Sequence, residues 1–191
     1  MKFEDDTSMR LYRQTVEDFG LYTGKVLSDQ EMEDLRDAAG KMSAKMRAVR
    51  IVSATSVSKK DLEQRLVHKG EDPEQAKEAV AWMSELNLLD DKRVAEQVVA
   101  RCVSKGYGLA RAKQALYEKK VPKQYWEAAL EDYPDQQEGI EDYLRSRLDS
   151  RSDEKEIKKA VDALLRRGHH YGTIRRVLNA LDFEAEEFPE E

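Results

Sequence analysis

The sequence has few of the residues and runs that mark secreted or membrane-spanning chains. Its 191 residues include one cysteine, four prolines and nine glycines. A single cysteine, Cys102, excludes an internal disulfide and fits a reducing compartment. No run of about 18 apolar residues is present that would cross a bilayer. The first ten residues, MKFEDDTSMR, lack the apolar core of a secretory signal. We therefore expect a cytoplasmic protein that makes no membrane contact.

Enzyme motifs are also missing from the sequence. There is no phosphate-binding glycine loop, no nucleophile elbow and no metalloprotease helix. Cys102 lies on an apolar helix face, where a buried and inert thiol is expected. His169 and His170 follow a glycine without cysteine or acid at ligand spacing, so we expect turn or surface histidines. We predict a protein that is not an enzyme, with no catalytic residue, no cofactor and no metal site.

Signals for helices dominate from residue 28 onward. Apolar residues recur at helical spacing, as in Ile157, Val161 and Leu164. Only 40% of the residues are hydrophobic and 38% are charged, which favours several modest helix contacts over one thick core. Helix starts are predicted from capping patterns at Ser28 with Glu31, Ser58 with Asp61, Asp72 before Pro73, Asp90 and Asp91, Asp135, and Ser152 or Asp153. These patterns predict an all-α fold.

The chain is self-similar over three segments, residues 61–80, 111–130 and 159–178. Their alignment places Leu66, Leu116 and Leu164 in one column, and Gly70, Lys120 and Gly168 in another, at spacings of 50 and 48 residues. Each segment reads as a helix, a short turn and a second helix. Units of this kind bury little surface alone and are stabilised by stacking on their neighbours. We expect an elongated, curved array of tandem three-helix (helix-turn-helix-like) repeats.

The repeats suggest a division of the chain into six segments. The first is an N-terminal arm with a short strand or irregular structure, and the last is an acidic, disordered tail. A helical segment follows the arm, and two full repeats and one partial repeat follow that. The predicted segments are 1–27 (arm), 28–57 (helical), 58–106 (repeat 1), 107–150 (repeat 2), 151–181 (partial repeat 3) and 182–191 (tail).

Cations gather in the repeats although the net charge is −6. Residues 92–120 hold eight cations against two anions, and residues 151–181 hold eight against four. On the helix that starts near residue 91, Arg93, Arg101 and Lys105 share an arc of about 120° opposite the apolar stripe. The helix dipole explains cations near helix C-termini, but it does not explain Arg93 or Arg111. A surface that contacts a polyanion or an acidic protein explains them better.

We predict that this surface binds a protein partner or DNA through basic residues and one tyrosine between residues 93 and 176. The residues are Arg93, Arg101, Lys105, Tyr107, Arg111, Lys113, Lys119, Lys120, Lys158, Lys159, Arg166, Arg167, Arg175 and Arg176.

The motifs from about residue 17 to 181 resemble those of the RecX family, regulatory proteins of the RecA recombinase. The most specific stretches are SKKDLEQRLVHKG at residues 58–70 and LLDDKRVAEQVVARCVSKGYGLARAKQAL at residues 88–116. They match the family's serine, acid and leucine run, its paired aspartates, and its glycine-flanked tyrosine turn before a basic helix. The chain departs from the family at ATSV, where arginines are expected, at Val94, where an aromatic residue is usual, and at Lys120, which replaces a glycine.

The resemblance implies a crescent of three-helix repeats that lies along the groove of a RecA filament on single-stranded DNA. Such a protein lowers the ATPase, strand-exchange and coprotease activities of RecA and limits filament growth, with effects on recombination, DNA repair and the SOS response. We expect a monomer with at most weak direct contact to DNA. Two other functions remain open from the residues: a helical protein that binds DNA directly, and a helical scaffold for another protein.

Overall fold

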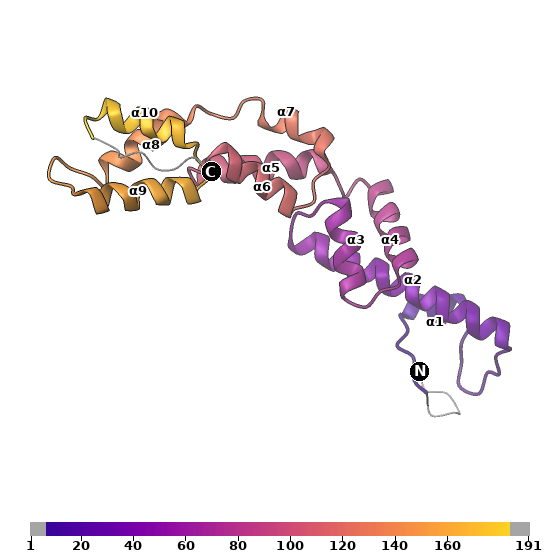
Figure 1. Cartoon of the computed structure of the whole chain (residues 1–191). Helices are drawn as coiled ribbons and strands as arrows, with labels where there is room; N and C mark the ends of the chain where they lie inside the picture. The colour runs from indigo at the N-terminus through magenta and orange to yellow at the C-terminus, as the bar shows by residue number, and fades with distance from the viewer. Residues whose placement is uncertain (1–6, 184–191) are drawn as a thin grey trace. The chain divides into compact units, whose positions relative to one another are not determined.

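The computed structural model describes residues 7–183. Within them the chain forms helices, turns and loops and no β-strand, which confirms the predicted all-α fold. The helices are α1 (Arg13–Asp18), α2 (Asp29–Ala54), α3 (Lys59–His68), α4 (Pro73–Glu85), α5 (Asp91–Ser104), α6 (Leu109–Glu118), the 3-10 helix η1 (Lys123–Tyr125), α7 (Trp126–Leu130), α8 (Gln136–Arg145), α9 (Glu154–Arg166) and α10 (Tyr171–Ala180) (Figure 1).

The chain divides into two compact units, Met1–Asp91 and Lys92–Glu191. In the first unit α2, α3 and α4 pack on one another around a core that includes Leu62, Leu66 and Met83. The Ser28 capping box at the start of α2 and the Asp72 cap at the start of α4 form as predicted. The predicted arm holds the six-residue helix α1, which the sequence analysis did not expect, and its described part contains no strand. Of the predicted acidic tail, residues 184–191 lie outside the described residues.

The second unit contains two hydrophobic cores. One joins α5, α6 and α7 through residues such as Val94, Val99 and Leu116. The other joins α8, α9 and α10, which lie together in Figure 1, through residues such as Leu144 and Leu164. The apolar stripe of α5 therefore packs with the helices that follow it, whereas the repeat spacing counted α5 with the helices before it. The repeat boundaries themselves stay a prediction.

The first helix of each repeat ends in the same way. The backbone N–H groups of Glu71, Val121 and His169 donate to the carbonyl oxygens of Leu66, Leu116 and Leu164, each over 3.1 Å. This is the helix ending that needs a left-handed residue at the position before the donor. Gly70, Lys120 and Gly168 occupy it, with φ of 90°, 54° and 84°. The three leucines are fully buried, so the structure agrees with both alignment columns.

Candidate functional site

Two basic turns of the second unit lie against each other. The first, residues 105–111, comprises the turn between α5 and α6 and the first residues of α6. The second, residues 166–170, comprises the last residue of α9 and the turn before α10. We call them the paired turns. The N–H of Gly108 donates to the carbonyl oxygen of Arg167 over 2.8 Å, and the N–H of Ala110 donates to that of Gly168 over 3.3 Å. The two backbones can approach this closely because neither Gly108 nor Gly168 has a side chain. The structure thereby brings the cations of the two turns onto one surface.

The backbone contact leaves no room for larger residues. A Cβ atom on Gly108 would lie 2.0 Å from the carbonyl oxygen of Gly168. A Cβ on Gly168 would lie 2.4 Å from the backbone nitrogen of Arg111, and Gly168 also has a positive φ. Both glycines are therefore required by the approach of the two turns, and Gly168 is also required by its own backbone conformation.

His169 completes the contact from the second turn. Its side chain is only 7% exposed, and its Nε2 lies 3.1 Å from the carbonyl oxygen of Gly106. His169 therefore lies in a turn, which is one of the two predicted placements, but it is not a surface histidine because the close approach of the turns buries the ring. His170 is exposed, and its Nδ1 accepts the N–H of Gly172 as the cap of α10.

Tyr133 braces the first turn from the segment after α7. Its hydroxyl donates to the carbonyl oxygen of Tyr107 over 2.6 Å. Burial raises the pKa of Tyr133 to about 12, so the phenol keeps its proton and remains a donor at neutral pH. Tyr107, at the centre of the first turn, is therefore held through its backbone, while its ring lies 5.8 Å from the ammonium group of Lys105.

The arginines of the paired turns have different surroundings. The guanidinium of Arg167 lies 4.6 Å from the ring centre of Tyr143 on α8, a cation–π contact that orients it. Arg111 is only partly available, because its Nη1 lies 3.0 Å from Oε1 of Glu118. That hydrogen bond lowers the pKa of Glu118. Both side chains of this pair remain 40 to 50% exposed, so the ion pair contributes little to stability and can exchange for another anion.

The other predicted residues extend from the paired turns along the same helices. Arg93 and Arg101 on α5 are exposed and eight residues apart, about 12 Å along the axis. Lys158 and Arg166 span α9 in the same way. None of the 14 predicted residues is buried. The structure thus brings together the predicted residues in or beside the paired turns, and it places the others on α5, α6, α9, α10 and the segment after α6, namely Arg93, Lys113, Lys119, Lys120, Lys158, Lys159, Arg175 and Arg176.

The residues considered for catalysis or metal binding lie in structural roles. Cys102 is buried in the helix face, and burial raises the pKa of its thiol. A protonated thiol is a poor nucleophile and a poor metal ligand. In the described part of the chain no group of three histidine, cysteine or acidic residues could hold a metal ion. No helix among residues 7–183 is long and apolar enough to cross a membrane.

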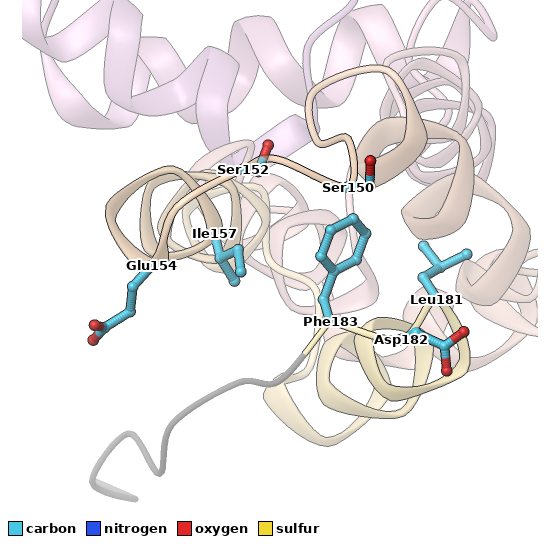
Figure 2. A pocket seen from close by; sticks show the side chains of 7 residues that line it. All are labelled: Ser150, Ser152, Glu154, Ile157, Leu181, Asp182 and Phe183. Atoms are coloured by element: carbon cyan, nitrogen blue, oxygen red, sulfur yellow. The ribbon is translucent and has the colours of Figure 1, made fainter.

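One pocket of about 600 Å³ lies beside the end of α10 (Figure 2). In the view of Figure 2, Phe183 stands between Ile157 and Leu181. Leu181 and Phe183 pack on the core of α8, α9 and α10, so the apolar part of the lining extends that core. None of the predicted basic residues lines this pocket. The paired turns and the basic helix faces beside them therefore remain the candidate site.

No sequence pattern indicated which residues build this site. Gly108, Gly168, His169 and Tyr133 carry no charge pattern, yet they hold the cations in place. The glycines on both sides of Tyr107 were the available signal, because a second glycine after a helix end is not needed to end the helix. Gly106 has the positive φ that ends α5, at 62°. Gly108 does not end the helix, and a glycine without that role is typical of a place where another backbone approaches closely.

Fold and site together define an all-α protein of three-helix units whose inter-helix turns carry the basic surface. A family model described as RecX, second three-helix domain, matches residues 90–130, which span α5 to α7. The regulatory protein RecX of Stenotrophomonas maltophilia (strain R551-3) is 32% identical over 133 residues, which cover 68% of this chain and 82% of the relative. That of Vibrio parahaemolyticus is 30% identical over 149 residues, which cover 76% of this chain and 94% of the relative. The chain belongs to the RecX family of regulatory proteins.

Solved structures show the same fold. A crystal structure of regulatory protein RecX superposes with a TM-score of 0.66 at 16% identity, over 93% of this chain and 91% of that chain. A crystal structure of RecX from Lactobacillus salivarius superposes with a TM-score of 0.63 at 24% identity, over 76% of this chain and 98% of that chain.

Proposed function

We propose that this protein is a non-enzymatic inhibitor of the RecA filament on single-stranded DNA. It lowers the ATPase, strand-exchange and coprotease activities of RecA and limits filament growth in recombination, DNA repair and the SOS response. It acts in the cytoplasm as a monomer. Membership of the RecX family supports a regulatory role, and the basic surface of the paired turns supports an acidic or nucleic-acid partner.

The observation that carries the proposal is the joining of two basic turns by the Gly108 and Gly168 backbones. A filament of RecA on DNA presents phosphates and acidic protein surface together. Cations held at fixed positions lose less conformational freedom on binding than cations on mobile loops. Lys105 and Arg167, each oriented by an aromatic ring, fit that requirement. The overall negative charge of the chain, −6, disfavours coating of free DNA.

The direct test is ATP hydrolysis by RecA on single-stranded DNA with increasing amounts of this protein. We expect the hydrolysis rate to fall at substoichiometric or comparable concentrations of protein to RecA. An unchanged rate with a folded sample contradicts the proposal. Disassembly of preformed filaments, followed with and without the protein, distinguishes blocked growth from inhibition along the filament.

A matched measurement without RecA tests direct DNA binding. A protein that neutralises 6 to 10 phosphates loses about 10³- to 10⁵-fold in affinity between 50 and 200 mM salt. Tight binding to DNA alone with that salt dependence would favour a DNA-binding protein over a filament regulator. Weak binding to DNA alone, with clear inhibition of RecA, supports the proposal.

A further inference from the structure

His169 lies at a position of the repeat where each repeat has a different type of residue. It follows the left-handed residue at the end of the first helix of the repeat, as Glu71 and Val121 do. All three side chains are buried. The Glu71 carboxylate accepts from Ser43 and Arg47 of α2, and Val121 joins the apolar core of α5 to α7. Among these three buried positions, only the one in the last repeat holds a residue of a type that titrates near neutral pH, a histidine.

The hydrogen bond of His169 identifies its protonated nitrogen. A carbonyl oxygen only accepts, so the contact with Gly106 requires a proton on Nε2 of His169. In the neutral ring Nδ1 is then a bare lone pair. Nδ1 is buried and has no hydrogen-bond partner in the described part of the chain. A second proton on the ring would therefore be a buried donor without an acceptor, which destabilises the closed arrangement.

The charges around His169 also disfavour its protonation. Arg167 on the same turn acts on it directly, as a like charge. The opposing turn contributes the cations Lys105 and Arg111, and the carboxylate of Glu118 is engaged by Arg111. The helix that starts beside it, α10, contains no acidic residue. Other titratable or charged groups of the two turns and of the helices beside them include the phenols of Tyr107, Tyr133 and Tyr171, the imidazole of His170, the Cys102 thiol, the carboxylates of Glu96 on α5 and Asp162 on α9, and the cations Arg101, Lys113, Arg166, Arg175 and Arg176.

We propose that His169 is a pH-sensitive latch on the paired turns. The neutral ring holds the turns together through Gly106, and protonation of the ring opens them. Opening separates the cations of α5 and α6 from those of α9 and α10 and so weakens the basic surface. The effect on RecA rests on the proposed function, whereas the opening of the turns does not.

The direction of the pH effect follows from the burial of the ring. Burial lowers the pKa of His169 below its ordinary value of about 6.5. The open form, with its ring in water, therefore binds a proton at a higher pH than the closed form does. The stabilisation by the latch is fully present above about pH 6.5, and it is lost as the pH falls through the lowered pKa of the closed form.

The test uses the full chain and nuclear magnetic resonance. The ring signals of the protein's three histidines are followed separately. The chemical shifts of the rings and the exchange protection of the Gly108 and Ala110 amides are followed from about pH 8 to about pH 5. The Val121 amide, which donates to Leu116 in the same unit, is the control for general unfolding.

We expect His169 to titrate below the ordinary histidine pKa of about 6.5. Protection of the Gly108 and Ala110 amides should be lost with the same midpoint as the His169 titration, while the Val121 amide stays protected. A His169 ring that titrates at or above about pH 6.5 overturns the proposal. Protection of Gly108 and Ala110 that does not change across the His169 titration also overturns it. These measurements need no variant, so they decide the question even if a substituted protein fails to fold.

Two variants connect the latch to inhibition. His169→Gln keeps a donor toward Gly106 but does not titrate, and His68→Gln is the matched control. Between about pH 7.5 and about pH 5.5, the wild type and His68→Gln should lose inhibition of RecA relative to His169→Gln. Equal pH dependence in all three proteins overturns the link between the latch and inhibition. If none of them inhibits RecA at neutral pH, the proposed function fails, and the amide measurements still decide whether the latch exists.

Discussion

The hydroxyl of Tyr133 donates a hydrogen bond of 2.6 Å to the backbone oxygen of Tyr107. Tyr133 follows α7 and Tyr107 lies between α5 and α6, so one side chain ties the segment after α7 to the first of the paired turns. The phenol lies in a partly buried environment, which raises its pKa to about 12. The conformation of the basic turn therefore depends on a residue that carries no charge.

The substitution Tyr133→Phe should destabilise the second unit by about 1 to 2 kcal/mol, because the Tyr107 carbonyl loses its partner. Urea unfolding at neutral pH measures this loss, and Tyr117→Phe, at an exposed ring, should change nothing. The folded pKa lies above the unfolded value of about 10, so the difference between wild type and Tyr133→Phe should shrink as the pH rises above about 10. A constant difference across that range would contradict the assigned role of the phenol.

The substitution Gly108→Ala should separate the paired turns. The added Cβ would lie 2.0 Å from the carbonyl oxygen of Gly168, so one backbone has to move. We expect a loss of about 1 to 3 kcal/mol in thermal or urea unfolding, together with weaker inhibition of RecA. Gly139→Ala on α8 is the matched control, since no atom lies within 4 Å of its added Cβ. That change should stabilise α8 by about 0.5 to 1 kcal/mol.

The substitution Lys120→Gly should stabilise the protein. Lys120 holds a left-handed conformation with φ of 54°, which costs a residue with a Cβ about 1 kcal/mol relative to glycine. Lys113→Gly removes the same side chain from the interior of α6 and should destabilise by about 1 kcal/mol. Opposite signs in the two unfolding free energies would confirm that backbone conformation decides the effect. A loss of stability on Lys120→Gly would show that the Lys120 side chain contributes more than its strain.

Alanine at the buried repeat leucines should cause large losses. Leu116 and Leu164 are fully buried, so each change to alanine should cost about 2 to 5 kcal/mol. Leu165→Ala, next to Leu164 but 40% exposed, should cost much less. Calorimetry or denaturant unfolding measures both. Similar losses at Leu164 and Leu165 would contradict the packing of α9.

Replacement of Arg101, Lys105 and Arg111 together by alanine should weaken RecA inhibition without unfolding the chain. These side chains are exposed or half-exposed, and the one ion pair among them that the described structure records, between Arg111 and Glu118, is solvent-exposed. The control removes three exposed cations of the first unit, Arg36, Lys60 and Lys69, and so changes the net charge equally. Inhibition that falls equally in both variants would point to general electrostatics instead of the paired turns.

Several features of the fold could be read from short stretches of sequence. The starts of α2 and α4 follow from Ser28 and Asp72, because a capping side chain acts within three residues. The ends at Gly70 and Gly168 follow from the left-handed position that glycine favours. The basic character of the two turns was also visible, as was the apolar face that buries Cys102.

The grouping of helices around each core could not be read in this way. An amphipathic stripe shows that a helix is covered but not which helix covers it, so the stripe of α5 did not show that α5 shares its core with α6 and α7. The pairing of Arg111 with Glu118 depends on two flexible side chains whose geometry the spacing does not determine.

By itself the sequence determined where several of the helices begin or end, which faces are apolar and where the cations lie, because capping, periodicity and left-handed turns act over a few residues. Only the tertiary structure decided that Gly108 lies against Gly168, that His169 is buried, and that the cations of two turns lie on one surface. Those outcomes depend on contacts between segments about 60 residues apart, which form when whole helices pack and which no local pattern encodes.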